Sequence, residues 1–193
     1  GINVEEGAAV DLDGVSIVAN DGEGLFLRGE TKDGKRARAN AKRLFVADGR
    51  KFDGIGMFVA KGALAELDGA LIRSSQRAGV IVNETTGEKG SRSEATLTHV
   101  VIRDTKQNGK AHRDEKTVAL DGIGIGSAGT LTVRTSAIVD NVQFGLIIGS
   151  PKGLTSVENT FIGATKPNAD GSFGHGLVAF TGSNLVIRDS EVV

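Results

Sequence analysis

The chain has 193 residues, a formal net charge of −1 and no cysteine, so neither disulfides nor thiol chemistry can support its fold or function. A chain of this length can bury enough surface for one hydrophobic core, and we expect a single domain over residues 1–193. No apolar run approaches the roughly 18 residues that a membrane-spanning helix needs.

A glycine-led apolar motif opens the chain and returns along it. The motifs begin at Gly1, Gly24, Gly56, Gly79, Gly122, Gly145 and Gly176. Three of the spacings are 23 residues, and 32, 43 and 31 residues separate the remaining pairs, so short and long repeats alternate. A recurring distance of this size is the signature of a solenoid.

Each motif begins a group of three short strands. In the first group the inward positions are Ile2 and Val4, then Val10 and Leu12, then Val15 and Ile17; in the group opened by Gly122 the first inward pair is Ile123 and Ile125. Alternation over three to five residues indicates strands rather than helices. Stacked groups predict an all-β fold, a three-sided parallel coil of about seven turns.

The alternation shifts between the second and third strands of a group. Asp13-Gly14 and Asp68-Gly69 stand at these places. Because Asp-Gly is a turn signal, we expect the chain to bend there.

The extra residues of the long repeats fall at two corners. They follow the first strand at 28–40, 83–94 and 149–153, and the third strand at 48–55, 105–121 and 165–175. Insertions at fixed corners gather on the flanks of a solenoid, where binding sites are common. We therefore expect two loop-rich edges.

Two of the three outer faces are predicted to be apolar. The outward positions of the first strand are Asn3, Phe26, Phe58, Ile81, Gly124, Ile147 and Val178, and those of the third are Ser16, Phe45, Leu71, Val101, Ala137, Phe161 and Glu191. Large exposed apolar patches are rare on monomers. We expect the insertions to cover Phe58 and Ile81, and an interface is the alternative.

The repeat resembles the right-handed parallel β-helix proteins of the pectate-lyase-like superfamily. The clearest copy is Val15-Ser16-Ile17-Val18-Ala19-Asn20, and the resemblance extends over essentially the whole chain. It implies a right-handed parallel β-helix. The functions it implies range from polysaccharide lyases and polygalacturonases to phage tailspikes, adhesins and other surface proteins.

No catalytic residue can be assigned. Gly174-His175-Gly176 is similar to an element of polygalacturonases, but the Asn-Thr-Asp, Asp-Asp and Arg-Ile-Lys elements of that family do not occur here. Hydrolysis of a glycosidic bond also needs two carboxylates at a set separation. His175 is interpreted as a loop residue.

A loop-edge groove is the candidate site for an enzyme. Its residues would be Asp48, Asp53, Asp114, Asp121, Asp170 and His175. Oxygen ligands suit Ca²⁺, but three of these aspartates stand in Asp-Gly turn signals, and turn chemistry is the favoured interpretation. We expect no cofactor, with calcium as the alternative.

A basic strip is the candidate site for a polymer. It consists of Lys32, Lys35, Arg36, Arg38, Lys42 and Arg43. Such a strip can concentrate an acidic polysaccharide or nucleic acid. The near-neutral net charge and the lack of Tyr and Trp disfavour nucleic acid and favour a solvated loop with ion pairs between turns.

The sequence therefore favours a non-catalytic segment of a secreted or cell-surface protein, a rigid scaffold or recognition module. A polysaccharide lyase, a glycoside hydrolase or an inactive remnant of one is the alternative. The chain begins and ends inside strand motifs, which predicts a fragment of a longer chain. Its expected partners are the rest of that chain or another protein at an exposed solenoid end, and a polysaccharide.

Overall fold

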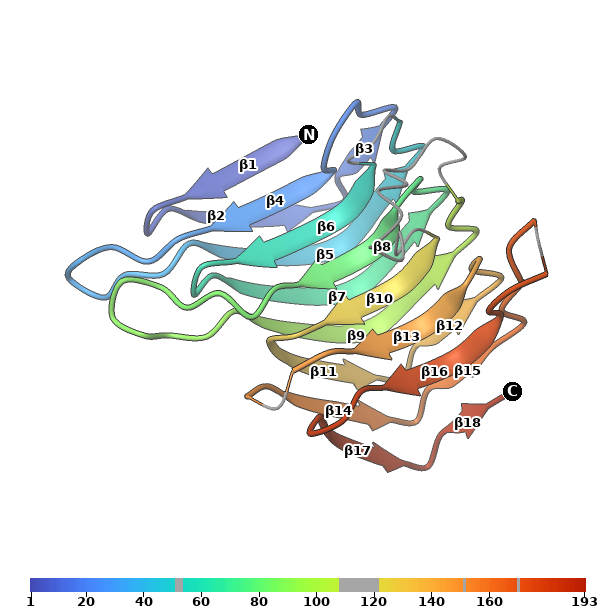
Figure 1. Cartoon of the computed structure of the whole chain (residues 1–193). Coiled ribbons are helices and arrows are strands. Elements are labelled where there is room, and N and C mark those ends of the chain that lie inside the picture. The colour runs from blue at the N-terminus through green and yellow to red at the C-terminus, as the bar shows by residue number, and fades with distance from the viewer. Residues whose placement is uncertain (51–53, 108–121, 151, 170) are drawn as a thin grey trace.

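The computed structural model describes residues 1–50, 54–107, 122–150, 152–169 and 171–193. Its strands stack in parallel from the N-terminal turn to the C-terminal turn (Figure 1). Within these ranges, no helix is both long and apolar enough to cross a membrane. The chain is a parallel β-helix.

The first sheet consists of the seven strands that follow, or contain, the glycine motifs. In spatial order they are β1 (Ile2–Glu5), β4 (Leu25–Arg28), β6 (Ile55–Ala60), β8 (Ala78–Val82), β10 (Ile123–Ser127), β13 (Phe144–Ile148) and β16 (His175–Ala179). Each pairs in parallel with its neighbours. A turn is named below by its strand in this sheet.

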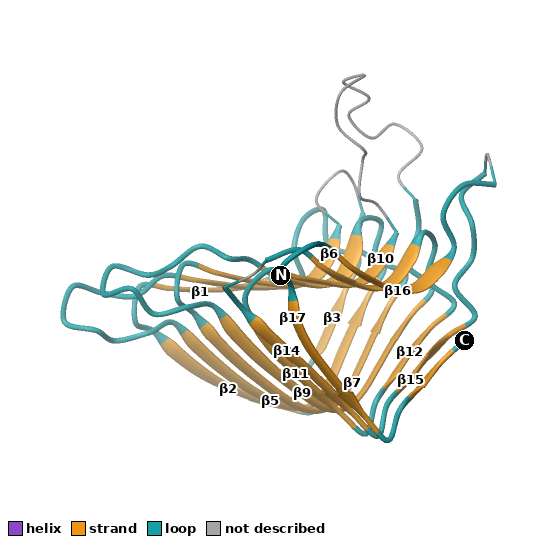
Figure 2. Cartoon of the chain, turned by 60° about the horizontal axis from the view of Figure 1, so that its bottom comes forward, coloured by secondary structure: helices purple, strands orange, loops and turns teal. Residues whose placement is uncertain are grey.

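The second sheet contains both other strands of every turn. Its elements are β2 (Ala9–Asp13), β3 (Ser16–Val18), β5 (Arg38–Ala47), β7 (Leu64–Arg73), β9 (Glu94–Arg103), β11 (Thr130–Arg134), β12 (Ala137–Val139), β14 (Leu154–Glu158), β15 (Phe161–Gly163), β17 (Asn184–Arg188) and β18 (Glu191–Val192). In β5, β7 and β9 the predicted second and third strands are continuous. Figure 2 shows this sheet folded along one line into two limbs, a second-strand limb and a third-strand limb.

One residue in the left-handed region forms the bend between the limbs in each turn. These residues are Gly14, Arg43, Gly69, His99, Thr135, Asn159 and Asp189, with φ between 47° and 74°. Gly14 and Gly69 belong to the two Asp-Gly pairs that predicted a bend. Because this one residue falls outside the alternation, apolar side chains on both limbs point inward.

The core consists of ladders of like side chains along the stack. Ile17, Val46, Ile72, Ile102, Ile138, Ile162 and Val192 form the third-strand ladder. Ile72, Ile138 and Ile162 are fully buried in it. Each such side chain contributes about 1.5–3 kcal/mol through burial. The outward row that begins with Ser16 and Phe45 also pairs as predicted.

The glycines stand where the start of a first strand meets this ladder. A Cβ on Gly79 would lie 2.3 Å from Cγ2 of Ile102 and 2.7 Å from the carbonyl oxygen of Gly124. The same holds for four other glycines of the first strands. An added Cβ would meet a branched third-strand side chain and the carbonyl oxygen of the next glycine at Gly24, Gly56, Gly124 and Gly145. The recurrence of glycine is therefore a requirement of close packing.

One predicted register is wrong. Ile125 pairs with Leu146 and Val80, so Gly124, not Gly122, is the glycine of the β10 turn, and the spacings there are 45 and 21 residues. The outward position accordingly belongs to Gly126. Of Gly122 and Gly124, only Gly124 has a Cβ position blocked by the third-strand ladder, 2.6 Å from Cγ2 of Ile138.

A second apolar cluster lies apart from the main core. It contains Ile55, Ala78, Ile123, Phe144 and Ile147. Ile123 therefore joins this cluster instead of the main core. Phe58 and Ile81 pack against it and are half-buried, and the ring of Phe58 stacks on that of Phe26 at 5.6 Å. Phe58 and Ile81 are thus partly covered within the chain, and the part of the cover expected from residues 108–121 lies outside the described residues.

The glycine contact gives a direct test of the stack. Gly79→Ala should lower the free energy of unfolding by about 2 kcal/mol or more, because neither the backbone carbonyl nor the buried Ile102 can move aside. Gly22→Ala is the matched control, since no atom lies within 4 Å of its Cβ position. Urea unfolding of both variants measures the difference, and equal stabilities would contradict the packing.

The corrected register gives a second test. Removing residues 56–123 joins Ile55 to Gly124 in the position that Ile123 occupies, because Ile55, Ala78 and Ile123 share one register. The shortened solenoid should fold, since each turn contacts its neighbours. Removing residues 56–121 instead shifts the junction by two residues and should give a less cooperative thermal transition by circular dichroism. If the chain without residues 56–121 were the more stable of the two, the predicted spacing of 23 residues from Gly122 would be correct.

Candidate functional site

Two long loops follow first strands and project on the same side of the stack (Figure 1). The first spans residues 29–37 after β4, and the second spans residues 83–93 after β8. The β6 turn lies between them and has only a short connection, from Lys61 to Ala63. The two long loops can therefore meet above it, and we call them the first-corner loops.

Glu30 joins the two first-corner loops. Its side chain is buried, with 5% of the residue exposed. The carboxylate accepts hydrogen bonds from the hydroxyl of Ser91 and from the backbone N–H groups of Lys89, at 2.9 Å, and Ser91, at 3.4 Å. The Ser91 hydroxyl is the main cause that lowers the pKa of Glu30, against the opposing effect of burial.

Arg36 also links the two first-corner loops, and its hydrogen bonds join the β4, β6 and β8 turns. Its guanidinium donates to Glu94 at 2.8 Å and to the carbonyl oxygen of Arg92 at 2.6 Å. It also donates to the carbonyl oxygens of Gly62 and Ala63 in the β6 turn. A charge with this many partners is a tether between loops and is not available to a polymer.

The rest of the basic strip divides between a loop and a strand. Arg38 pairs with Glu66 at 3.2 Å, Arg43 with Asp13 at 2.7 Å, and Lys35 with Asp33 at 3.2 Å. Lys42 is exposed on β5, and Lys32 lines a cavity beside the first-corner loops. Four of the six cations thus have carboxylate partners, three of them on a neighbouring turn or beyond, which fits the favoured interpretation of a solvated strip with ion pairs between turns.

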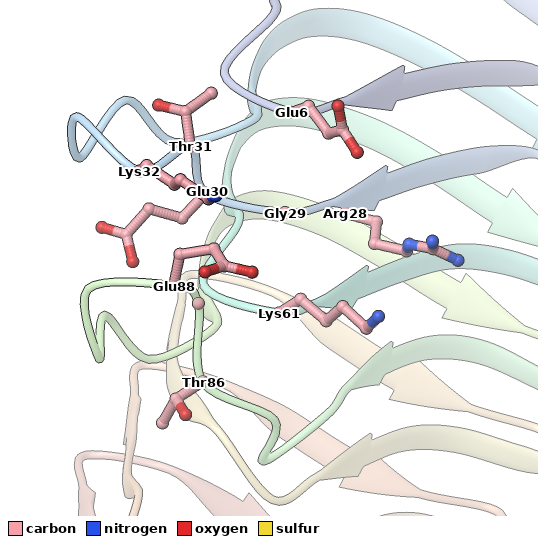
Figure 3. A pocket seen from close by; sticks show the side chains of 10 residues that line it. Glu6, Arg28, Gly29, Glu30, Thr31, Lys32, Lys61, Thr86 and Glu88 are labelled. Atoms are coloured by element: carbon pink, nitrogen blue, oxygen red, sulfur yellow. The ribbon is translucent and has the colours of Figure 1, made fainter.

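The cavity beside these loops has a volume of about 600 Å³. Glu6, Arg28 and Lys61 reach it from three successive strand ends, and the remaining lining comes from the first-corner loops (Figure 3). Acidic Glu6 and Glu88 stand among the cations, so the lining has no dominant charge. A neighbouring cavity of about 470 Å³ shares Lys61 and Thr86 with it.

The predicted loop-edge groove is tested only in part. Asp53, Asp114, Asp121 and Asp170 lie outside the described residues. Asp48 is half-buried, with φ of 55°, directly after β5. His175 is exposed at the start of β16, and its ring stacks on that of Phe144 at 6.1 Å. Four first-sheet strands separate the turns of Asp48 and His175, so the stack does not bring these two together.

Among the residues that the structure describes, no group of three or more His, Cys, Asp or Glu side chains could hold a metal ion. The lining at the first corner offers the hydroxyl of Thr86 and side-chain charges of both signs. Chemically, it can bind a polar ligand through hydrogen bonds.

Comparison with known proteins identifies the fold. No protein-family model matches the sequence, and no curated protein matches it. The crystal structure of pectate lyase Pel9A matches the whole chain with a TM-score of 0.56 at 14% identity. The chain spans 52% of the length of that protein. At this identity the likeness establishes the pectate-lyase-like β-helix fold alone.

The buried carboxylate predicts a pH dependence. The pKa of Glu30 is lowered from 4.5, so its contribution to stability is present above pH 4.5 and is lost as the pH falls through the lower value of the folded state. The stability difference between wild type and Glu30→Gln should therefore be largest near neutral pH and shrink on acidification. Glu88→Gln, on the exposed part of the same cavity, is the control. A difference that does not change with pH would contradict this role.

Proposed function

We propose that this pectate-lyase-like β-helix is a non-catalytic segment of a secreted or cell-surface protein, a rigid scaffold that presents the first-corner loops to a hydroxyl-rich ligand such as a polysaccharide. The proposal has two parts. The stack supplies stiffness and register, and the loops supply the recognition surface.

The main support for the scaffold is that charged side chains on the second-strand limb link neighbouring turns to one another. On the second-strand limb one outward column reads Asp13, Lys42, Asp68, Thr98, Arg134, Glu158 and Arg188. Arg43 pairs with Asp13, His99 with Asp68 at 2.8 Å, and Arg134 with Glu158 at 3.4 Å. Each link joins neighbouring turns.

These links fit a scaffold better than an active site. Exposed ion pairs contribute about 0–1 kcal/mol each, but opposite charges on neighbouring strands also disfavour a slipped register. A glycoside hydrolase needs two carboxylates grouped around one bond. Of the carboxylates named here, Asp13 and Glu158 each face an arginine, and Asp68 faces the imidazole of His99.

The first-corner loops support the recognition part. Glu30 and Arg36 hold them in one arrangement, so binding does not have to order them, which favours affinity. Thr86 offers a hydroxyl in the same lining as Lys61 and Glu88, whereas the hydroxyl of Thr31 is engaged with Asp33 and with the backbone of Lys35 in its own loop. Donors and acceptors in this mixture match the hydroxyls of a sugar chain without requiring a charged one.

A polysaccharide-active enzyme remains the second candidate. The likeness to a pectate lyase supports its fold, and His175 and Asp48 stand at the corner that follows the third strands, where the longer insertions occur. Under this alternative the chain would cleave a polymer as well as bind it.

Binding and cleavage can be separated in one experiment. The purified chain should be retarded in gels that contain a plant or bacterial polysaccharide, with no new reducing ends and no unsaturated products, with or without calcium. Lys61→Ala should weaken retardation about tenfold, the loss of roughly one charged hydrogen bond. Lys106→Ala, an exposed lysine beyond β9, should have no effect.

Formation of new reducing ends or unsaturated products would contradict the scaffold proposal and support the polysaccharide-active enzyme. Absence of retardation in every gel would remove the recognition part. Equal loss in the Lys61 and Lys106 variants would place binding away from the first corner.

A further inference from the structure

The two neighbouring cavities at the first corner differ in charge. We call the cavity of about 600 Å³ the first cavity and that of about 470 Å³ the second cavity. The lining of the first cavity balances three cations with three carboxylates. In the lining of the second, Lys61, Arg92 and Lys152 stand with a single carboxylate, that of Glu84. Three cations and one carboxylate leave two positive charges uncompensated in the second cavity.

The three cations of the second cavity differ from those that fasten the loops. No carboxylate among the described residues forms an ion pair with Lys61, Arg92 or Lys152. All three residues are exposed, whereas the guanidinium of Arg36 is surrounded by its partners. These three charges are therefore available to a ligand.

The second cavity lies on interior turns of the stack. Its residues come from the β6, β8, β10 and β13 turns, and the first-sheet strand of each pairs with a neighbour on both sides. The β10 turn contributes Ala128 and Gly129. Because neither residue has a long side chain, the space between Arg92 and Lys152 stays open.

The backbone around the second cavity is held in place by hydrogen bonds. The hydroxyl of Thr85 accepts one from the backbone N–H of Lys61 at 2.9 Å, and the side chain of Asn83 accepts one from the backbone N–H of Thr85 at 2.9 Å. The carbonyl oxygen of Arg92 accepts one from Arg36. A ligand therefore does not have to order this loop, which favours affinity.

The charge of the lining favours a doubly charged ligand group. A carboxylate or a sulfate ester carries one negative charge and leaves one cation of the lining uncompensated. A phosphate monoester carries about −1.5 to −2 at pH 7 and has three acceptor oxygens. The guanidinium of Arg92 can donate two parallel hydrogen bonds to such a group, and the ammonium groups of Lys61 and Lys152 can donate to its other oxygens.

We propose that the second cavity binds a phosphate monoester group carried by a sugar. The carrier rests on the proposed recognition of a polysaccharide at the first corner, because the two cavities share Lys61 and Thr86 and one sugar chain can extend through both. The phosphate site itself rests on the charges of the lining.

Three ligands built on the glucose ring test the charge of the group. Near pH 7.5, glucose 6-phosphate should bind about tenfold more tightly than glucose 6-sulfate or glucuronate, because it carries more negative charge. The preference should shrink towards pH 5, since the second pKa of the phosphate is about 6 and the described lining contains no histidine. Amide chemical shifts of the 193-residue chain measure the affinities. Equal affinities, or a preference that does not change with pH, would contradict a phosphate site.

Inorganic phosphate tests the carrier. It should bind about tenfold more weakly than glucose 6-phosphate, because the sugar ring gains contacts of its own beside Thr86. Equal affinity would indicate a site for free phosphate and would contradict a sugar carrier.

Variants locate the phosphate site. Lys152 lines the second cavity and not the first, so Lys152→Gln should weaken the binding of glucose 6-phosphate about tenfold. Lys106→Gln, which removes an exposed charge beyond β9, is the control and should have no effect. Glu84→Gln should strengthen binding, because it removes the carboxylate of the lining, and a damaged fold cannot produce such a gain. Unchanged binding by the Lys152 variant, or weaker binding by the Glu84 variant, would overturn the proposal.

The two proposals for the first corner can fail separately. Retardation by uncharged polysaccharides without a preference for glucose 6-phosphate would contradict the phosphate site alone. Binding of glucose 6-phosphate without retardation in any gel would contradict the polysaccharide carrier and support the phosphate site.

Discussion

A single left-handed residue at each bend of the second sheet is the constraint on which the rest of the structure depends. It folds one sheet into two limbs and shifts the alternation by one residue, so that Leu67 before the bend and Ile72 after it both reach the core. For residues other than glycine this conformation costs about 1–2 kcal/mol each, and Thr135, which is β-branched, occupies it at φ of 48°. The fold tolerates this free-energy cost because the bend allows apolar side chains on both limbs to be buried at once.

The bend also determines where charge can be placed. Arg43 and His99 stand at the bend itself, and their side chains reach Asp13 and Asp68 on the preceding strands. The same residues that turn the backbone therefore fasten adjacent turns. At the first corner this task passes to the loops, where Glu30 and Arg36 reach over an entire turn.

The regular part of the fold could be predicted from the sequence, because its information is local. The row of Phe45, Leu71 and Val101 follows from alternation within each strand. The register at β10 could not be read in this way, since Gly122 and Gly124 are two residues apart and both satisfy the alternation. The methyl group of Ile138 distinguishes them, and that contact exists only in the folded stack.

The candidate site was harder to predict for the same reason. Glu30 meets Ser91, 61 residues away, and nothing around Glu30 in the sequence indicates the contact. The alternation of long and short repeats did indicate that loops would gather at this corner. A charged residue of these loops acts as a tether only if the fold brings partners to it. The basic strip in the sequence therefore could not assign a role to Arg36.

The span of Arg36 also bears on the order in which the stack comes apart. In a solenoid with contacts only between neighbours, any turn can open independently of those two steps away. Arg36 connects the β4, β6 and β8 turns directly, so opening any one of them breaks bonds held by the others. These turns therefore form one cooperative unit. Amide hydrogens of the β4, β6 and β8 turns should accordingly exchange together, as one unit.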